Sequence, residues 1–370
     1  RLTMQTAERL ACLELALTPQ VGAVSFLKLL QAFSSASAVW SVPSSQLNPI
    51  VSSKAIAAIT AHQGLEALQA ALTWETQHPD NHLICLVDDD YPISLSEIDA
   101  PPPLLFARGD TSLLQQPSVA LIGSRHASAS GLHIAHDLSA ELSRYGICIV
   151  SGFAAGIDTA AHQGCLHAQG KTIAVLGTGI DRVYPASNRD LAHQISATGL
   201  LLSEFPLGTA PIAHNFPRRN RIIAGLSQAI IVIEATLESG SLITARLGLE
   251  MNKEVMAVPG SIHNPHSKGC HALIKQGAKL VESVNDILEE CPLLPQIRPV
   301  NELTKEKTTP IACVNELSPL LKAMGFDPIH PDQLVDKLGI SATDVYAELL
   351  QLELQGKIAA LSGGRYQRIT

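Results

Sequence analysis

Three arginines stand within four positions of one segment, next to an aromatic residue. The segment is Asn215–Gly225 (NFPRRNRIIAG), and the arginines are Arg218, Arg219 and Arg221. If Pro217 begins a helix, Arg218 and Arg221 share one face of it and Arg219 points elsewhere. Guanidinium groups make forked contacts to phosphates, whereas the helix dipole disfavours cations at a helix start. The segment therefore indicates an anionic ligand, with a solvated basic face as the alternative.

Short turns rich in glycine and serine supply a second kind of anion ligand. Each follows an apolar run, and the clearest are Gly123-Ser124-Arg125, Ser151–Asp158 (SGFAAGID), Leu176–Gly179 (LGTG) and Ser239-Gly240-Ser241. Glycine lets another backbone approach closely, and amides at a helix start bind anions. Asp158 and the serines have a simpler alternative role as helix caps. Phe153 and Phe216 are candidates for base stacking, although burial is the alternative for aromatic side chains.

No cofactor or metal is expected from these motifs. Gly152 and Gly156 match a dinucleotide fingerprint only loosely, and residues 174–178 (AVLGT) lack the acid that would bind a ribose. His263 and His266 have no cysteine or acid nearby and are expected in an ordinary polar loop. No Walker A, HExxH, GxSxG or kinase motif occurs, so we expect a binding protein rather than an enzyme.

A parallel sheet would bring the glycine turns to one edge. Apolar runs without polar alternation predict buried strands at residues 119–123, 147–151, 172–176, 200–203, 229–234, 255–258 and 279–281. Helix-compatible stretches separate them, at residues 129–144, 157–168, 188–197, 241–250, 269–276 and 284–290. This alternation predicts an α/β fold with an extended, Rossmann-like, doubly wound parallel sheet. Ligands of such sheets bind beyond the carboxyl ends of the strands.

The flanks differ in character from the centre. Residues 1–75 predict a helical domain, and residues 76–291 contain the sheet together with a Pro-rich stretch at Pro101–Pro103. Residues 292–312 are rich in Pro, Thr and charge and predict a linker. Residues 313–370 predict three helices and a hairpin at Gly363-Gly364, which is the winged-helix pattern. This tail is a candidate DNA-binding domain or, alternatively, a docking or dimerisation module.

Charge and composition do not exclude a polyanionic ligand. The 370-residue chain has a net charge of −8, but residues 118–282 hold 13 Lys and Arg against 11 Asp and Glu and therefore carry +2. The acidic excess belongs to the flanks. Seven scattered cysteines without a CxxC motif disfavour a disulfide framework and favour a reducing cytoplasm. The start is unlike a signal peptide and no apolar run is long enough to cross a bilayer, so no membrane insertion is expected.

Specific strings make the central region resemble the DprA/Smf family of DNA-processing proteins. They are GSR at 123–125, SGFAAGID at 151–158, GKTIAVLGTGID at 170–181, FPRRNRIIAGLS at 216–227, ESGSLITA at 238–245, VPG at 258–260 and SKGCHALIKQGA at 267–278. The start of the chain is similar to the family's sterile-alpha-motif-like (SAM-like) domain, with a degenerate helix-hairpin-helix turn at residues 19–22. The tail looks like the family's winged-helix domain.

The resemblance implies a cytoplasmic mediator of natural transformation. Such a protein binds and protects incoming single-stranded DNA, loads RecA onto it, and acts as a homodimer. By position, the DNA-binding residues that the resemblance implies are Gly123, Ser124, Arg125, Ser151, Gly152, Phe153, Lys171, Phe216, Arg218, Asn220, Arg221, Ser239, Gly240 and Ser241. Phe153 stands where the family often has Met or Leu. Lys171 matches a DNA-binding lysine, although its place before a strand predicts the opposite edge of the sheet. Leu273 and Ile274 are candidates for the dimer interface.

Two other function classes stay open. A nucleotide-binding enzyme of the lysine-decarboxylase-like phosphoribohydrolase type would use Glu234 or Glu238 as an acid near Ser239-Gly240, although its PGGxGT signature is absent. A winged-helix transcription factor would use the tail and prefer duplex DNA.

Overall fold

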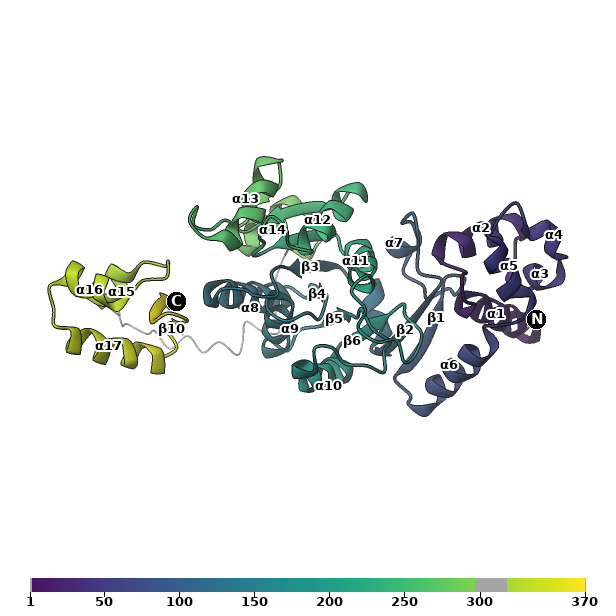
Figure 1. Ribbon diagram of the computed structural model, residues 1–370, viewed down its shortest axis with the longest axis horizontal. Helices are drawn as coiled ribbons and strands as arrows, with labels where there is room; N and C mark the ends of the chain where they lie inside the picture. The colour runs from purple at the N-terminus through teal and green to yellow at the C-terminus, as the bar shows by residue number, and fades with distance from the viewer. Residues whose placement is uncertain (1, 297–317, 370) are drawn as a thin grey trace.

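The structure is a computed structural model that describes residues 2–296 and 318–369 (Figure 1). Its centre is a nine-stranded sheet in the order β1-β2-β6-β5-β4-β3-β7-β8-β9. The strands are β1 (Asn81–Cys85), β2 (Leu104–Gly109), β3 (Ser118–Ile122), β4 (Cys148–Ser151), β5 (Thr172–Val175), β6 (Leu200–Ser203), β7 (Ala229–Val232), β8 (Glu254–Ala257) and β9 (Lys279–Leu280). The strands from β3 to β9 are parallel, which confirms the predicted α/β fold with its large parallel sheet.

The sheet also has an antiparallel extension that the apolar pattern did not predict in full. The apolar run LICLVD at residues 83–88 predicts a strand, and β1 overlaps it, but β2 was missed because it follows directly on the proline-rich stretch at Pro101–Pro103. β2 pairs antiparallel with β1 on one side and with β6 on the other. The nine-stranded sheet is therefore mixed at one end.

Helices cover both faces of the sheet, as a doubly wound fold requires. The connecting helices are α8 (Ala129–Arg144), α9 (Ile157–His167), α10 (Arg189–Thr198), α11 (Asn215–Leu226), α12 (Ser241–Glu250), α13 (Lys268–Lys275) and α14 (Val284–Glu290). One core contains apolar residues of α8, α9 and α14, and a second contains those of α11, α12 and α13. The chain runs from β3 through β4 and β5 to β6 on one side and returns to β7 on the other side of β3. The strand order thus switches direction at β3.

The N-terminal helices share a core with the sheet. They are α1 (Leu2–Leu17), α2 (Ala23–Phe33), α3 (Ala36–Ser41), α4 (Ser44–Leu47), α5 (Ser53–Thr60) and α6 (Leu65–Gln77). Phe26 and Trp74 belong to the same apolar cluster as Leu83 of β1 and Phe106 of β2. The Arg9 guanidinium donates a hydrogen bond of 2.8 Å to the Leu83 carbonyl. The helical unit therefore packs directly against the antiparallel end of the sheet (Figure 1).

The C-terminal residues form a small unit with a core of its own. Its elements are α15 (Pro319–Met324), α16 (Pro331–Leu338), α17 (Ala342–Leu354), β10 (Ile358–Leu361) and β11 (Arg365–Arg368). β10 and β11 pair antiparallel as the predicted hairpin, and Gly363 and Gly364 in its turn both have positive φ. Most of the predicted linker at 292–312 lies outside the described residues. Within the residues that the structure describes, no helix has the length and apolar character needed to span a bilayer.

Helices α8 and α9 cross at a point where only glycine fits. The backbone of Gly164 in α9 lies against the His136 carbonyl of α8, so a β-carbon at position 164 would clash with that backbone. Alanine is otherwise favoured over glycine inside a helix by about 1 kcal/mol. The close approach of the two helices therefore requires glycine at position 164, although alanine has the higher helix propensity.

We expect the Gly164→Ala substitution to lower the free energy of unfolding by about 1–3 kcal/mol, as overpacking does in a filled core. Gly22→Ala is the control, because Gly22 has φ −82° and no atom lies within 4 Å of its would-be β-carbon. This control should change stability by at most about 1 kcal/mol. Urea titration followed by circular dichroism measures both, and equal losses would contradict the close crossing.

Candidate functional site

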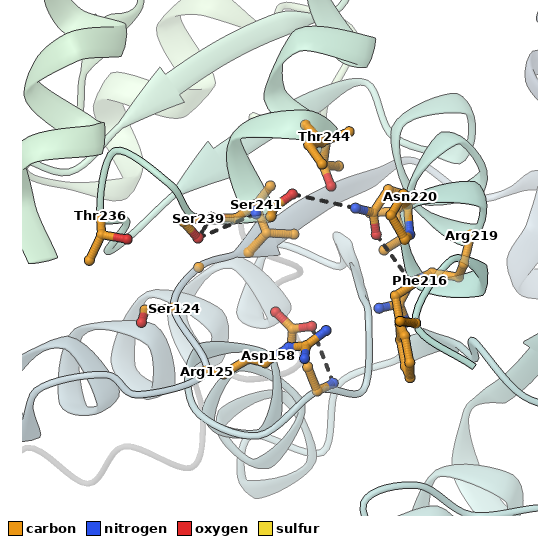
Figure 2. Close-up of a pocket in the computed structure, with 18 residues that line it drawn as sticks. Ser124, Arg125, Asp158, Phe216, Arg219, Asn220, Thr236, Ser239, Ser241 and Thr244 are labelled. Atoms are coloured by element: carbon orange, nitrogen blue, oxygen red, sulfur yellow. Dashed lines mark hydrogen bonds between the residues drawn. The ribbon is translucent and has the colours of Figure 1, made fainter. Parts of the chain in front are cut away.

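A cavity of about 390 Å³ opens at the carboxyl ends of the central strands (Figure 2). It lies where the strand order switches, the usual ligand position in open α/β sheets. It is lined by Ile122, Gly123, Ser124, Arg125, Ala154, Asp158, Ala213, Phe216, Pro217, Arg219, Asn220, Ile223, Thr236, Ser239, Gly240, Ser241, Ile243 and Thr244. Eight of the predicted site residues are therefore brought together: Gly123, Ser124, Arg125, Phe216, Asn220, Ser239, Gly240 and Ser241.

One wall of the cavity is made of hydroxyl and amide groups at the start of α12. The Ser239 and Ser241 hydroxyls lie 2.7 Å apart, and the Asn220 side-chain amide of α11 reaches the Gly240 carbonyl at 3.5 Å. The N-cap residue Gly240 has no side chain with which to cap the helix. The Ser241 amide donates to the Ser239 hydroxyl at 3.3 Å, and the Leu242 amide donates to the Ser239 carbonyl at 3.1 Å. The positive end of the helix dipole and the two serine hydroxyl groups are therefore what this wall offers to the oxygens of a phosphate.

The turn after β3 needs its glycine because three chain segments meet there. A β-carbon at Gly123 would lie 2.6 Å from the Ile157 side chain and 2.8 Å from the Glu234 carbonyl. The Ser124 amide donates to that same carbonyl at 2.7 Å, and the Ile157 amide donates to the Ser124 carbonyl at 3.2 Å. These bonds fix the turn that presents the Ser124 and Arg125 side chains to the cavity.

A buried arginine forms the floor of the cavity. Arg219 is only 4% exposed, and its guanidinium donates hydrogen bonds to the carbonyls of Gly152 after β4 and Val175 at the end of β5. Asp158, which also lines the cavity, is the nearby carboxylate (Figure 2). Burial lowers the pKa of Arg219 to about 10, and Asp158 opposes this shift. Burial likewise raises the pKa of Asp158, against the pull of Arg219.

Arg219 was not among the predicted site residues. It lines the cavity because it lies on a different face of α11 from Arg218 and Arg221. The predicted sharing of one helix face by Arg218 and Arg221 agrees with the structure, since both contact Glu204. Arg221 donates to the two Glu204 carboxylate oxygens at 2.8 and 2.7 Å. That face does not line the cavity, and Arg219 points into it instead. The one sequence feature that pointed to this difference was the helical spacing, which places Arg219 on another face than Arg218 and Arg221.

Arg125 is the exposed cation of the site. Its guanidinium lies over the Phe216 ring, 5.2 Å from the ring centroid. Arg125 and Phe216 also line a second, smaller cavity of about 80 Å³, together with Gly152, Phe153, Ala154, Ala155, Gly177, Tyr184 and Pro185. These two side chains therefore border both cavities.

Four other predicted residues lie away from the main cavity or cannot act in the way expected. Ser151 is buried and its hydroxyl donates to the Leu121 carbonyl at 2.6 Å. Lys171 precedes β5, and its ammonium donates to the Thr198 carbonyl at 2.9 Å, at the opposite edge of the sheet. Base stacking by Phe153 needs correction: its ring is 1% exposed and packs near the His162 ring, so no base can reach its face. Leu273 is only 7% exposed and packs in a core of its own chain.

Two predicted residues remain, Gly152 of the DNA-binding set and Ile274 of the dimer-interface pair. Gly152 borders the smaller cavity, and a β-carbon there would collide with the Asp158 and Arg219 side chains. Ile274 packs partly buried against the same core as Leu273.

Glu234 and Glu238, the two candidate acids of a hydrolytic enzyme, are not placed for catalysis at either cavity. The Glu234 carboxylate accepts hydrogen bonds from the Ser128 amide at 2.8 Å and the Ser128 hydroxyl at 2.5 Å, at the start of α8. Glu238 is exposed and does not line either cavity. The geometry therefore gives no support to a hydrolytic role for these two residues.

Comparisons with known proteins identify relatives along most of the chain. Residues 82–292 match the family model for DNA recombination-mediator protein A, and residues 306–364 match the DprA winged helix domain. The chain is 39% identical to Protein Smf of Synechocystis over 80% of this chain and 82% of that protein. It is 49% identical to DNA processing protein DprA of Streptococcus pneumoniae over 55% of this chain and 72% of that protein.

Two solved structures are similar as well. The structure of DNA processing protein A from Streptococcus pneumoniae has a TM-score of 0.67 and 40% identity, covering 75% of this chain and 95% of that one. A structure of DNA processing protein A from Helicobacter pylori, described for its single-stranded DNA binding mode, has a TM-score of 0.52 and 31% identity, covering 56% of this chain and 95% of that one. The resemblance drawn from the sequence strings and the predicted winged-helix domain are both confirmed.

We expect the Arg219→Gln substitution to lower the free energy of unfolding by about 3–5 kcal/mol, because it leaves the buried Asp158 carboxylate and two buried carbonyls without their cation. Arg218→Gln, one position earlier, is the matched control. Its side chain is 53% exposed and contacts Glu204 at 3.6 Å, so a loss below about 1 kcal/mol is expected. Chemical denaturation measures both, and equal losses would refute a structural role for Arg219.

His162 predicts a dependence of stability on pH. Burial lowers its pKa from 6.5 to about 3, and its Nδ1 lies 2.7 Å from the Thr172 hydroxyl. Because the folded-state pKa is below the unfolded one, the stability that the neutral ring contributes is complete above about pH 6.5 and is lost as the pH falls towards 3. The slope from one proton is about 1.4 kcal/mol per pH unit. Unfolding titrations between pH 5 and 6.5 should show a shallower slope for His162→Gln than for the wild type; parallel slopes would contradict this.

Proposed function

This chain belongs to the DNA recombination-mediator protein A family, and from that premise we propose that it binds single-stranded DNA in the cavity at the carboxyl ends of its central strands. The observation that carries the proposal is the meeting of Arg125, the Ser239 and Ser241 hydroxyls and the start of α12 at one cavity. The single-stranded DNA binding described for the Helicobacter pylori relative supports it.

The shape of the cavity favours unpaired nucleotides over a duplex. A volume of about 390 Å³ accommodates single phosphates and sugars but not a double helix. Unpaired strands rotate freely about their backbone, so phosphates turn inwards to the Ser239 and Ser241 hydroxyl groups at the start of α12 while bases splay outwards. Arg125 supplies the exposed charge, whereas the buried Arg219 guanidinium lies beside the Asp158 carboxylate in the cavity floor.

The proposal includes the later steps that the family implies. The bound strand is protected during natural transformation in the cytoplasm, and RecA is loaded onto it. The protein acts as a homodimer, which joins two cavities on one strand and raises affinity through avidity. For the interface, Ile274 is the better candidate of the two residues expected, because it is only partly buried in its own chain.

We expect Arg125→Ala to weaken binding of a fluorescein-labelled single-stranded oligonucleotide by about tenfold or more, the size of a lost charge-assisted hydrogen bond. Arg144→Ala is the matched control, because Arg144 is exposed at the far end of α8. Fluorescence anisotropy measures both variants against single strands and duplex.

The same titrations test the number of phosphates engaged. With about four phosphates neutralised, the logarithm of affinity should fall against the logarithm of salt with a slope of about −3. Binding that is independent of salt, or tighter for duplex than for single strands, would overturn the proposal.

A further inference from the structure

We infer that Cys12 and Cys85 form a site of reversible oxidation, at which hydrogen peroxide converts the two thiols into a disulfide between the N-terminal helices and the sheet. Cys12 lies on α1 and Cys85 ends β1, and in the structure both are free thiols. Neither residue lines either of the two cavities beside Arg125. The inference is therefore independent of DNA binding.

The packing of α1 on β1 brings the two cysteines to one interface. The Arg9 guanidinium of α1 donates to the Leu83 carbonyl of β1 at 2.8 Å. Cys12 follows Arg9 by three residues on the same face of the helix, and Cys85 follows Leu83 by two on the same face of the strand. Both cysteines are completely buried and share one apolar cluster with Leu83. Their sulfur atoms lie within hydrogen-bonding reach of each other.

The two thiols differ in acidity, as a nucleophile and its partner require. The hydrogen bond from the Cys12 thiol lowers the pKa of Cys85 against the effect of burial, and the Val87 amide lowers it further. The same bond, together with burial, raises the pKa of Cys12. The thiolate, not the thiol, is the nucleophile. Cys85 therefore attacks the oxidant, and Cys12 completes the disulfide.

Burial has the opposite effect on the other cysteines of the described residues. It raises the pKa of Cys165 and of Cys270 to about 12, and that of Cys291 to about 11. It also raises the pKa of Cys148 well above its ordinary value. Within residues 2–296 and 318–369, Cys85 is thus the one cysteine whose surroundings favour the thiolate.

An open cavity of about 770 Å³ beside the pair gives a small oxidant a route to it, and Glu8 and Val87 belong to its lining. The Glu8 Oε1 atom lies 3.9 Å from the Cys12 sulfur, so one side chain separates the cavity from this thiol. Val87 donates its amide to Cys85 from the same wall. Hydrogen peroxide is little larger than water, and a local opening of this wall admits it.

The reaction balances with one molecule of hydrogen peroxide. The Cys85 thiolate attacks one peroxide oxygen: the sulfur–oxygen bond forms, the oxygen–oxygen bond breaks, hydroxide leaves, and Cys85 becomes a sulfenic acid. The hydroxide takes the proton of the Cys12 thiol and becomes water. The Cys12 sulfur then attacks the Cys85 sulfur, and the sulfenic oxygen leaves as hydroxide. The sulfur atoms lose two electrons in total, and the peroxide oxygens gain them.

The test treats the full chain with hydrogen peroxide, alkylates the remaining thiols in denaturant, and maps the peptides by mass spectrometry. We expect a peptide pair linked through Cys12 and Cys85, which dithiothreitol separates. The oxidised protein should unfold at a urea concentration about 1 M higher than the reduced protein, because the disulfide closes a long loop of the unfolded chain.

Serine variants assign the two roles. In Cys12→Ser the sulfenic acid at Cys85 has no partner, so dimedone, which labels sulfenic acids, should mark Cys85. In Cys85→Ser the attacking sulfur is gone, and Cys12 should be recovered as an alkylated thiol. Cys291→Ser is the matched control: Cys291 is also a buried free thiol, and its loss should leave the linked peptide pair unchanged.

Peptide mapping of the wild type decides the question even where a serine variant fails to fold. Recovery of Cys12 and Cys85 as alkylated thiols after peroxide treatment would overturn the inference. Oxidation of Cys165 or Cys270 ahead of Cys85 would do so as well, and so would a Cys12–Cys85 link that forms only after the protein is unfolded in urea.

Discussion

The site depends on one buried cation, the Arg219 guanidinium. It joins the turn after β4 to the end of β5 through the Gly152 and Val175 carbonyls, and it sits beside the Asp158 carboxylate. Removing a guanidinium from water is costly, so an arginine is retained at such a place only where several acceptors surround it. The glycine at position 152 is part of the same arrangement, because a β-carbon there would strike the guanidinium. The floor of the cavity is thus fixed before any ligand arrives.

Neutral donors explain how an acidic protein can present a site for a polyanion. The chain carries a net charge of −8, and the charged residues that line the main cavity are Arg125, Arg219 and Asp158. Much of the remaining lining consists of hydroxyl groups and the first turn of α12. Hydroxyl groups and the positive end of a helix dipole attract phosphate oxygens through partial charges that do not change the net charge of the chain.

The sequence sufficed to predict the gathering of the glycine turns, because buried parallel strands must end at one edge of their sheet. It did not suffice for side chains whose direction depends on distant partners. Glu204 draws Arg218 and Arg221 to a face outside the cavity, and nothing near residue 218 in the sequence reveals that acid. Phe153 has φ 61° and turns its ring inwards, which the SGFAAGID pattern does not indicate. Strand β2 was missed because the prolines before it favour irregular chain, and only its pairing with β1 and β6 establishes it.

The division of the apolar cores has a consequence for how the molecule melts. Phe26 and Trp74 share a cluster with β1 and β2, so the N-terminal helices and the sheet lose their packing together. The core of the C-terminal unit, which includes Leu320, Leu349 and Ile358, shares no residue with the others. Cooperative transitions follow contiguous cores. Calorimetry of the full chain is therefore expected to resolve a large endotherm for the first unit and a separate small one for the C-terminal unit.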